Sequence, residues 1–356
     1  MATTDTIRTP VFSDTDKRHM RTALALSRRG LGNVWPNPAV GSVVVSGDGT
    51  VVGRGWTQPG GRPHAEAIAL QRAGAAAEGG TIYVTLEPCN HFGKTPPCTE
   101  AIVAAGIARV VGTLEDPDPR VSGSGYDRLR QAGIRVDLGL LADEAREANA
   151  GFFSRLTKGR PWVTLKMAIS MDGRIALASG QSQWITCPEA RQIAHKLRAE
   201  NDAILVGIGT VIADDPQLTC RLPGYEGRQP VRVVLDGKDR IPPGAGILSD
   251  DAPTWTDRDL GNGAGERPDP ASMLGAMSDR GITRLLIEGG GNVAAAFIAA
   301  DLVDEIVCVS APMVIGGDGI PVVGPTAATE LDGLHRFHRK SVEPVGCDTM
   351  VRYIRN

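Results

Sequence analysis

A histidine, two cysteines and a glutamate in the first third of the chain have the residue types and order of a catalytic zinc site. One imidazole (His64) and two thiolates (Cys89 and Cys98) form a soft ligand set that suits zinc. Three protein ligands leave a fourth position open for water, which zinc acidifies toward neutral pH. Glu66 follows the histidine by two residues and can reach that water without ligating the metal, so we predict that it is the catalytic acid and base. The set predicts one catalytic zinc ion per chain, because no other histidine and cysteine set has ligand spacing.

The segments around these residues predict how each ligand is held. A helix over 64–73 would begin at the histidine, and a second helix over 98–105 would begin at the second cysteine. Cys89 would lie on the loop after a strand over 81–86. Unpaired N–H groups and the positive end of the dipole at a helix start favour a thiolate. We therefore expect both helix starts to face one metal.

The remaining segments of the first 150 residues predict a helix-covered sheet. They are a helix over 14–29, strands over 40–45 and 51–56 that form a hairpin, a strand over 109–113 and a strand over 134–138. An acidic helical stretch with Asp143, Glu144 and Glu147 then leads to Lys158-Gly159-Arg160-Pro161. We place the domain boundary there, with one domain over 1–150 and another over 160–356.

The second half of the chain predicts another α/β unit. Its expected elements are a helix over 188–198, a helix after Gly291, and strands over 162–169, 203–206, 231–235, 284–287 and 305–309. Residues 236–267 are rich in glycine, proline and aspartate, which predicts an irregular insertion or mobile loop.

Two glycine clusters in this second unit are candidate phosphate sites. Gly207-x-Gly209-Thr210 and Glu288-Gly289-Gly290-Gly291 each follow a predicted strand and precede a helix, so each offers backbone N–H groups to an anion. Neither is the Gly-x-Gly-x-x-Gly pattern of dinucleotide-binding folds. Each cluster alone also fits a structural turn, whereas the two together indicate a nucleotide cofactor.

Three charged residues of the second unit have both a functional and a structural interpretation. Asp214 and Arg221 bracket a polar run, which fits a solvated loop or a site for a sugar hydroxyl and a phosphate. Lys166 lies in an otherwise apolar strand. A buried lysine needs a partner, and a ligand phosphate is one candidate.

Composition excludes several classes of function. The 356 residues carry a net charge of −3 and few aromatic side chains, which disfavours a nucleic-acid partner. No apolar run approaches the roughly 20 residues of a membrane span, and the N-terminal residues do not resemble a signal peptide. We therefore expect a cytoplasmic protein that acts on a small molecule. A homo-oligomer is a separate expectation, which does not follow from composition. Four further cysteines lack disulfide spacing and are expected to be small buried side chains: Cys187, Cys220, Cys308 and Cys347.

With these residues in view, the chain over about residues 14–355 resembles the bifunctional deaminase/reductase family of bacterial riboflavin biosynthesis. The common zinc deaminase signature has two residues between its cysteines, whereas eight separate Cys89 from Cys98 here, and this longer loop is highly specific. The motifs that carry the resemblance are Asn37-Pro38-x-Val40-Gly41, His64-Ala65-Glu66, residues 87–98, 165–173, 182–186, Leu197-Arg198-Ala199, 207–211, 214–221 and Glu288-Gly289-Gly290.

The resemblance implies two consecutive reactions on one phosphorylated pyrimidine. The N-terminal domain, an α/β/α domain similar in fold to cytidine deaminase, would deaminate 2,5-diamino-6-ribosylamino-pyrimidinone 5′-phosphate. The C-terminal α/β domain, similar to dihydrofolate reductase, would use NADPH to reduce the ribosyl side chain to ribityl. The implied substrate-binding residues are Asn37, His91 and Lys94 in the first domain and Lys166, Ser182, Arg198, Asp214, Arg221 and Glu288 in the second. The implied NADPH-binding residues are Ala168, Trp184, Thr210, Gly289 and Gly290.

Two other functions compete with this interpretation. A deaminase of another nucleotide fused to a pteridine or folate-type reductase would have the same zinc site but would turn over cytidine, deoxycytidylate or dihydrofolate. A non-catalytic zinc-stabilised or RNA-binding module is disfavoured, because Glu66 stands beside an open zinc position.

Overall fold

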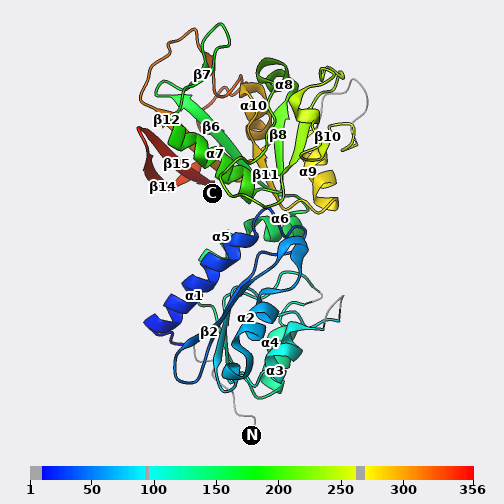
Figure 1. Ribbon diagram of the computed structural model, residues 1–356. Helices are drawn as coiled ribbons and strands as arrows, with labels where there is room; N and C mark the ends of the chain where they lie inside the picture. Colours follow the sequence, from blue (N-terminus) through cyan, green and yellow to red (C-terminus); the bar gives the residue numbers. More distant parts are fainter. Residues whose placement is uncertain (1–9, 93–95, 120, 262–268) are drawn as a thin grey trace. The chain divides into compact units, whose positions relative to one another are not determined.

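The computed structural model describes residues 10–92, 96–119, 121–261 and 269–356. The chain divides into two compact units, Met1–Thr157 and Lys158–Asn356, each built around its own sheet (Figure 1). Among the described helices, none is long and apolar enough to cross a membrane.

The first unit contains a five-stranded sheet in the order β2-β1-β3-β4-β5. Strand β1 is antiparallel to both β2 and β3, and β3, β4 and β5 are parallel. The elements are α1 (Asp14–Ser27), β1 (Gly41–Val45), β2 (Val51–Trp56), α2 (Ala65–Ala73), β3 (Thr81–Val84), α3 (Cys98–Ala104), β4 (Arg109–Gly112), α4 (Ser124–Gln131), β5 (Arg135–Leu138), α5 (Ala142–Ala148) and α6 (Ala150–Lys158). The predicted hairpin, strands and ligand-bearing helices are confirmed, whereas α4 and α6 were not predicted.

Helices cover both faces of this sheet. Because side chains alternate between the faces of a strand, Val43 and Val45 pack with Met20 of α1 and with α5, whereas Val44 packs with Ala69 of α2 and with α3 and α4. The result is a three-layer α/β/α unit. The layer that holds α2 and α3 also carries the predicted zinc ligands.

The second unit contains an eight-stranded sheet in the order β10-β9-β8-β11-β6-β12-β15-β14. The first six strands of that order are parallel, and the C-terminal hairpin β14–β15 adds to β12 in the antiparallel direction. The elements are β6 (Trp162–Ser170), β7 (Arg174–Ala176), α7 (Pro188–Glu200), β8 (Ala203–Gly207), α8 (Ile208–Asp214), β9 (Val231–Leu235), β10 (Thr254–Thr256), α9 (Pro270–Asp279), β11 (Arg284–Ile287), α10 (Gly291–Ala299), β12 (Glu305–Ala311), β13 (Ile320–Pro321), β14 (Phe337–Val345) and β15 (Asp348–Arg355). The predicted strands and helices of this half are confirmed.

The prediction of an irregular segment over 236–267 is wrong for its middle part. Residues 254–256 form β10, which pairs in parallel with β9 at the sheet edge. Arg232 of β9 is fully buried and donates to the backbone carbonyls of Ser249 and Ala252. This buried side chain fixes the segment before β10 against β9, a contact that local composition does not reveal.

The prediction that four cysteines are buried holds for Cys220 alone. Cys187 and Cys308 are half-buried, and Cys347 is exposed. Cys347 lies in the two-residue connection between the paired residues Val345 and Asp348 of β14 and β15. A hairpin turn lies at the end of a sheet, so its side chains remain outside the core.

Candidate metal centre and active-site cavities

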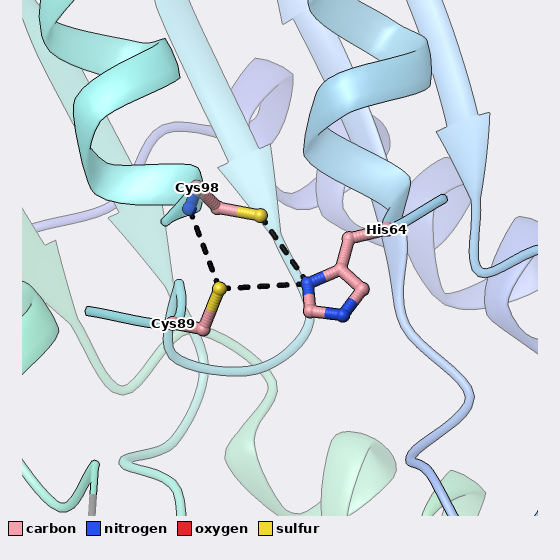
Figure 2. A group of neighbouring side chains, drawn as sticks. All are labelled: His64, Cys89 and Cys98. Atoms are coloured by element: carbon pink, nitrogen blue, oxygen red, sulfur yellow. Dashed lines mark hydrogen bonds between the residues drawn. The ribbon is translucent and has the colours of Figure 1, made fainter. Parts of the chain in front are cut away.

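The starts of two helices bring the predicted zinc ligands of the first unit together (Figure 2). His64 is the N-cap residue of α2 and has an extended backbone, with φ −71° and ψ 160°. Cys98 is the first residue of α3, and its backbone N–H donates to Cys89 Sγ over 3.3 Å. The loop after β3 therefore places the first cysteine against the unpaired N–H groups of α3, as a thiolate ligand requires.

The distances between the ligand atoms fit one tetrahedral zinc ion. His64 Nδ1 lies 3.5 Å from Cys89 Sγ and 3.3 Å from Cys98 Sγ. Bond lengths of about 2.3 Å for Zn–S and about 2.0–2.1 Å for Zn–N give a sulfur–nitrogen edge of about 3.5 Å in a tetrahedron. All three ligand atoms lie within 4.8 Å of one another. The residues thus have both the chemistry and the spacing of a zinc site.

The protonation of these side chains also suits a cation. Hydrogen bonding from the Cys98 thiol, assisted by His64, lowers the pKa of Cys89 to about 4. A lowered pKa favours the thiolate, which is the form that binds zinc. Glu66 lies in the first turn of α2 and is only 3% exposed, and this burial raises the pKa of its carboxyl. A divalent cation bound by the three ligands would lower the pKa of the same carboxyl.

A cavity of about 410 Å³ opens beside the zinc ligands. His64, Glu66 and Cys89 line it together with Asn37 and His91, so five sequence-predicted residues share one space. Lys94, the other predicted substrate-binding residue of this unit, lies outside the described residues.

Backbone contacts hold Asn37 in this cavity. Its side-chain Nδ2 donates to the carbonyl of Val34 over 3.3 Å. Gly61 has a φ of 84°, and a Cβ at that position would lie 2.0 Å from the same nitrogen. Only glycine therefore leaves room for the amide, whose remaining hydrogen-bonding groups can contact a ring in the cavity.

Sequence reasoning missed the residues that α6 and the loops before α2 and α4 contribute to this cavity. Arg62, Asp116, Asp118 and Arg155 also line it. The loop before α4 is positioned by Glu87, a buried carboxylate that accepts the backbone N–H groups of Asp116 (3.0 Å), Gly123 (2.8 Å) and Gly125 (2.8 Å). The sequence signal for this role was the position of Glu87, two residues before the zinc ligand Cys89. The sequence alone did not show that its carboxylate positions a loop.

In the second unit, one cavity of about 1040 Å³ collects every reductase residue that the sequence analysis named. Strands β8, β11 and β6 are adjacent and parallel, so the residues that follow β8 and β11 meet at one edge of the sheet. Lys166 and Ala168 lie two residues apart on β6, so their side chains point to the same face of the sheet. The named residues that line the cavity are Lys166, Ala168, Ser182, Trp184, Arg198, Thr210, Asp214, Arg221, Glu288, Gly289 and Gly290.

Glu288 is the centre of a charge cluster in this cavity. Its carboxylate accepts two hydrogen bonds from Arg198, of 2.8 and 3.0 Å, and lies 3.8 Å from Lys166 Nζ. Burial alone would raise the pKa of Glu288, but the two cations outweigh burial and lower it to about 2. Lys166 thus has a partner within the protein. Two cations and one carboxylate leave a net charge of +1, which favours an anionic ligand.

Both glycine turns pack against the side chain of Val293 on α10. A Cβ at Gly289 would lie 2.8 Å from Val293 Cβ, and a Cβ at Gly207 would lie 3.0 Å from the Cγ2 atom of that valine. Gly290, the N-cap residue of α10, has open space around its Cα. The first two glycines therefore allow close packing, and the third leaves the N-terminus of α10 accessible from the cavity.

One face of α7 supplies further residues that sequence reasoning did not select. Arg191 and His195 line the cavity with Arg198, at the i, i+4 and i+7 spacing of one helix face. That spacing was the available signal. The Arg191 guanidinium lies 4.5 Å from the ring centroid of Trp184, whose side chain is 65% exposed. An exposed indole at a cavity wall offers a stacking surface for a planar ligand.

Comparisons with known proteins match both units. A family model of the cytidine and deoxycytidylate deaminase zinc-binding region matches residues 13–114, and one of the RibD C-terminal domain matches residues 161–351. The riboflavin biosynthesis protein RibD of Aquifex aeolicus is 41% identical over 97% of this chain and 100% of its own length. That of Escherichia coli is 40% identical over 95% and 99%.

Solved structures of related proteins are similar to this chain over both units. Acinetobacter baumannii RibD has a TM-score of 0.87 and 38% identity over 96% of this chain and 99% of its own. A Thermotoga maritima protein described as a diaminohydroxyphosphoribosylaminopyrimidine deaminase/5-amino-6-(5-phosphoribosylamino)uracil reductase has a TM-score of 0.86 and 36% identity over the same shares. The predicted fold class, a cytidine deaminase-like unit followed by a dihydrofolate reductase-like unit, is confirmed. This chain belongs to the RibD family of riboflavin biosynthesis proteins.

Proposed function

We propose that this chain deaminates 2,5-diamino-6-ribosylamino-pyrimidinone 5′-phosphate and then reduces the ribosyl side chain of the product with NADPH. The observation that carries the proposal is the pairing of two sites in one chain. One has three ligand atoms at zinc spacing beside a buried glutamate, and the other is a large cationic cavity with glycine turns. We assign deamination to residues 1–150 and reduction to residues 160–356.

In the deaminase unit, His64, Cys89 and Cys98 would hold the zinc ion. When bound, zinc lowers the pKa of a water molecule at its open position. Glu66 is not a ligand, so its carboxylate is free to take a proton from the attacking water. It would deliver that proton to the ring nitrogen. It would then take the remaining proton from the hydroxyl added to the ring carbon and pass it to the amine, which leaves as ammonia.

Substrate orientation in this unit would come from the side chains that line the same cavity. Asn37 offers an amide to the pyrimidine ring, and His91 stands on the long loop between the two cysteines. Lys94 on that loop would contact the ribose phosphate. These proposed roles of His91 and Lys94 would account for the eight residues between the cysteines.

In the reductase unit, the net positive cluster would bind the phosphorylated sugar chain. When bound, NADPH supplies the hydride, and the protein supplies orientation and charge. Lys166 and Arg198, held by Glu288, face the same cavity as Ser182, Asp214 and Arg221. The cofactor would lie along Gly289-Gly290, Thr210 and Ala168 with Trp184 as a stacking surface.

Product analysis tests the proposal directly. The full-length protein is incubated with the diaminopyrimidine phosphate, with and without NADPH, and ammonia release and NADPH oxidation are measured separately. We expect ammonia in both mixtures and NADPH oxidation only after deamination. Turnover of cytidine, deoxycytidylate or dihydrofolate in place of this substrate would refute the assignment.

We also propose that the protein acts in the cytoplasm as a homo-oligomer without nucleic acid. The net charge of −3 and the low aromatic content support a small-molecule substrate. Strand β14 lies at the edge of the eight-stranded sheet, and edge strands offer backbone groups for pairing with another chain. Sedimentation velocity measures the assembly state.

A further inference from the structure

Two cysteines that lie far apart in the sequence meet at one end of the second unit. Cys187 is the N-cap residue of α7, and Cys347 lies on the turn between β14 and β15. Their sulfur atoms and a carboxylate oxygen of Asp348 all lie within 4.8 Å of one another. This cluster contains none of the residues assigned to either reaction.

Several contacts fix the hairpin turn on the start of α7. Asp348 Oδ2 accepts the backbone N–H of Cys187 over 2.8 Å, and the Cys187 thiol lies 3.2 Å from the carbonyl of Val345. Gly346 has a φ of 60°, and a Cβ there would lie 2.8 Å from Cys187 Sγ and 2.7 Å from Glu189 Oε2. The turn therefore approaches so closely that only glycine fits between the two segments.

The cluster is rich in negative and soft ligand atoms and poor in positive charge. Asp348 is only 3% exposed. Within the described ranges its contacts are the Cys187 N–H and the Cys347 thiol at 3.6 Å, with no lysine or arginine in an ion pair. Glu189 brings a second carboxylate against the same turn. A buried carboxylate is costly unless a cation or several donors compensate its charge.

We propose that Cys187, Cys347 and Asp348 bind a second zinc ion, separate from the ion at His64, Cys89 and Cys98. Zn–S bonds of about 2.3 Å give a sulfur–sulfur distance of about 3.8 Å in a tetrahedral site. This distance is compatible with the ligand atoms of the cluster, which all lie within 4.8 Å of one another. Thiolates select zinc over magnesium or calcium. Binding displaces the two thiol protons. The three residues leave the fourth zinc position open to water.

The second zinc ion would stabilise one wall of the larger cavity. Trp184 and Thr186 precede Cys187, Ala190 and Arg191 follow it, and all four line that cavity. Zinc would join the start of α7 to the C-terminal hairpin and reduce local opening of this segment. The role is structural, so the proposal does not depend on which substrate the cavity binds.

Zinc content measures the site in the full-length protein. Wild type and the variants Cys187→Ser, Cys347→Ser and Cys308→Ser are loaded with Zn²⁺ under reducing conditions, dialysed and analysed by plasma mass spectrometry. We expect two zinc ions per chain in the wild type and in Cys308→Ser, whose half-buried thiol lies outside both clusters. We expect one ion in Cys187→Ser and in Cys347→Ser.

Hydrogen exchange and intact mass complete the test. Zinc should slow amide exchange in residues 184–191 of the wild type at least about fivefold and leave these residues unchanged in Cys347→Ser, which separates a specific site from loose surface binding. One zinc ion per chain in the wild type, or two in both cluster variants, would overturn the proposal. So would a mass two hydrogens lower with no added metal, which would show a disulfide instead.

Discussion

Replacing Glu288 with glutamine should destabilise the second unit by about 3 kcal/mol. The carboxylate compensates Arg198 and Lys166, whose side chains are only 12% and 18% exposed. Removing one partner of a buried ion pair typically costs about 3–5 kcal/mol, because the remaining charge is left uncompensated. We take the lower end because Lys166 lies 3.8 Å away and reaches the edge of the cavity.

The pKa of this carboxyl leads to the same magnitude. It falls from an ordinary value of 4.5 to about 2. A difference of about 2.5 units at about 1.36 kcal/mol per unit gives about 3 kcal/mol. Because the folded-state pKa is the lower one, this stabilisation is fully present above pH 4.5 and is lost as the pH falls through about 2. The variant should lack that acid-sensitive contribution.

Amide hydrogen exchange on the full-length protein is the appropriate assay, because a two-unit chain does not unfold in a single step. Peptides from β11 and α7 should open roughly 100-fold more often in Glu288→Gln, as 3 kcal/mol implies. Peptides from the first unit should be unchanged and serve as an internal reference. Glu226→Gln, at an exposed site in the loop between α8 and β9, is the matched control and should shift stability by at most about 0.5 kcal/mol.

A double variant tests the cause. If an uncompensated Arg198 is responsible, Arg198→Met combined with Glu288→Gln should be less destabilising than the sum of the two single changes. Strict additivity, or a loss in Glu288→Gln no larger than in the Glu226→Gln control, would refute the argument from buried charge.

Four further predictions address the two sites. Glu66→Gln should keep zinc and reduction but lower deamination by about 10²–10⁴-fold, since an amide cannot transfer protons; an ammonia assay within tenfold of wild type would point to another acid/base group. Cys98→Ala should lose the ion at the first site, and metal analysis that still finds zinc on His64 and Cys89 would contradict the ligand set. Arg221→Ala should impair NADPH oxidation and spare ammonia release, because it lies in the second unit; equal loss of both activities in a folded protein would indicate one composite site. Arg240, which lines the larger cavity just beyond the end of β9, should contribute to a preference for NADPH over NADH; Arg240→Gln should raise the KM for NADPH at least about fivefold and leave the KM for NADH unchanged, and parallel changes in both would exclude a contact with the 2′-phosphate.

The sequence alone determined the chemistry that local patterns encode. A histidine two residues before a glutamate, and a Pro-Cys followed by a second cysteine, identify a zinc site because each ligand stands at a helix start or on the loop before one. Glycines between a predicted strand and helix likewise indicate phosphate turns. These signals span only a few residues, and the backbone geometry they require is local. The α/β class and the hairpin over 41–56 could be predicted for the same reason.

Only the tertiary structure decided which distant residues become partners. Arg198 and Glu288 are 90 positions apart, and they meet because α7 packs on β11, with Leu197 and Leu286 in one core cluster. Strand β10 pairs with β9, and the buried Arg232 of β9 holds the segment that precedes β10. Cys187 and Cys347 had no ligand spacing in the sequence, yet a hairpin turn brings their sulfur atoms together. Strand order and close packing are set by the whole core, so no short pattern encodes such pairs.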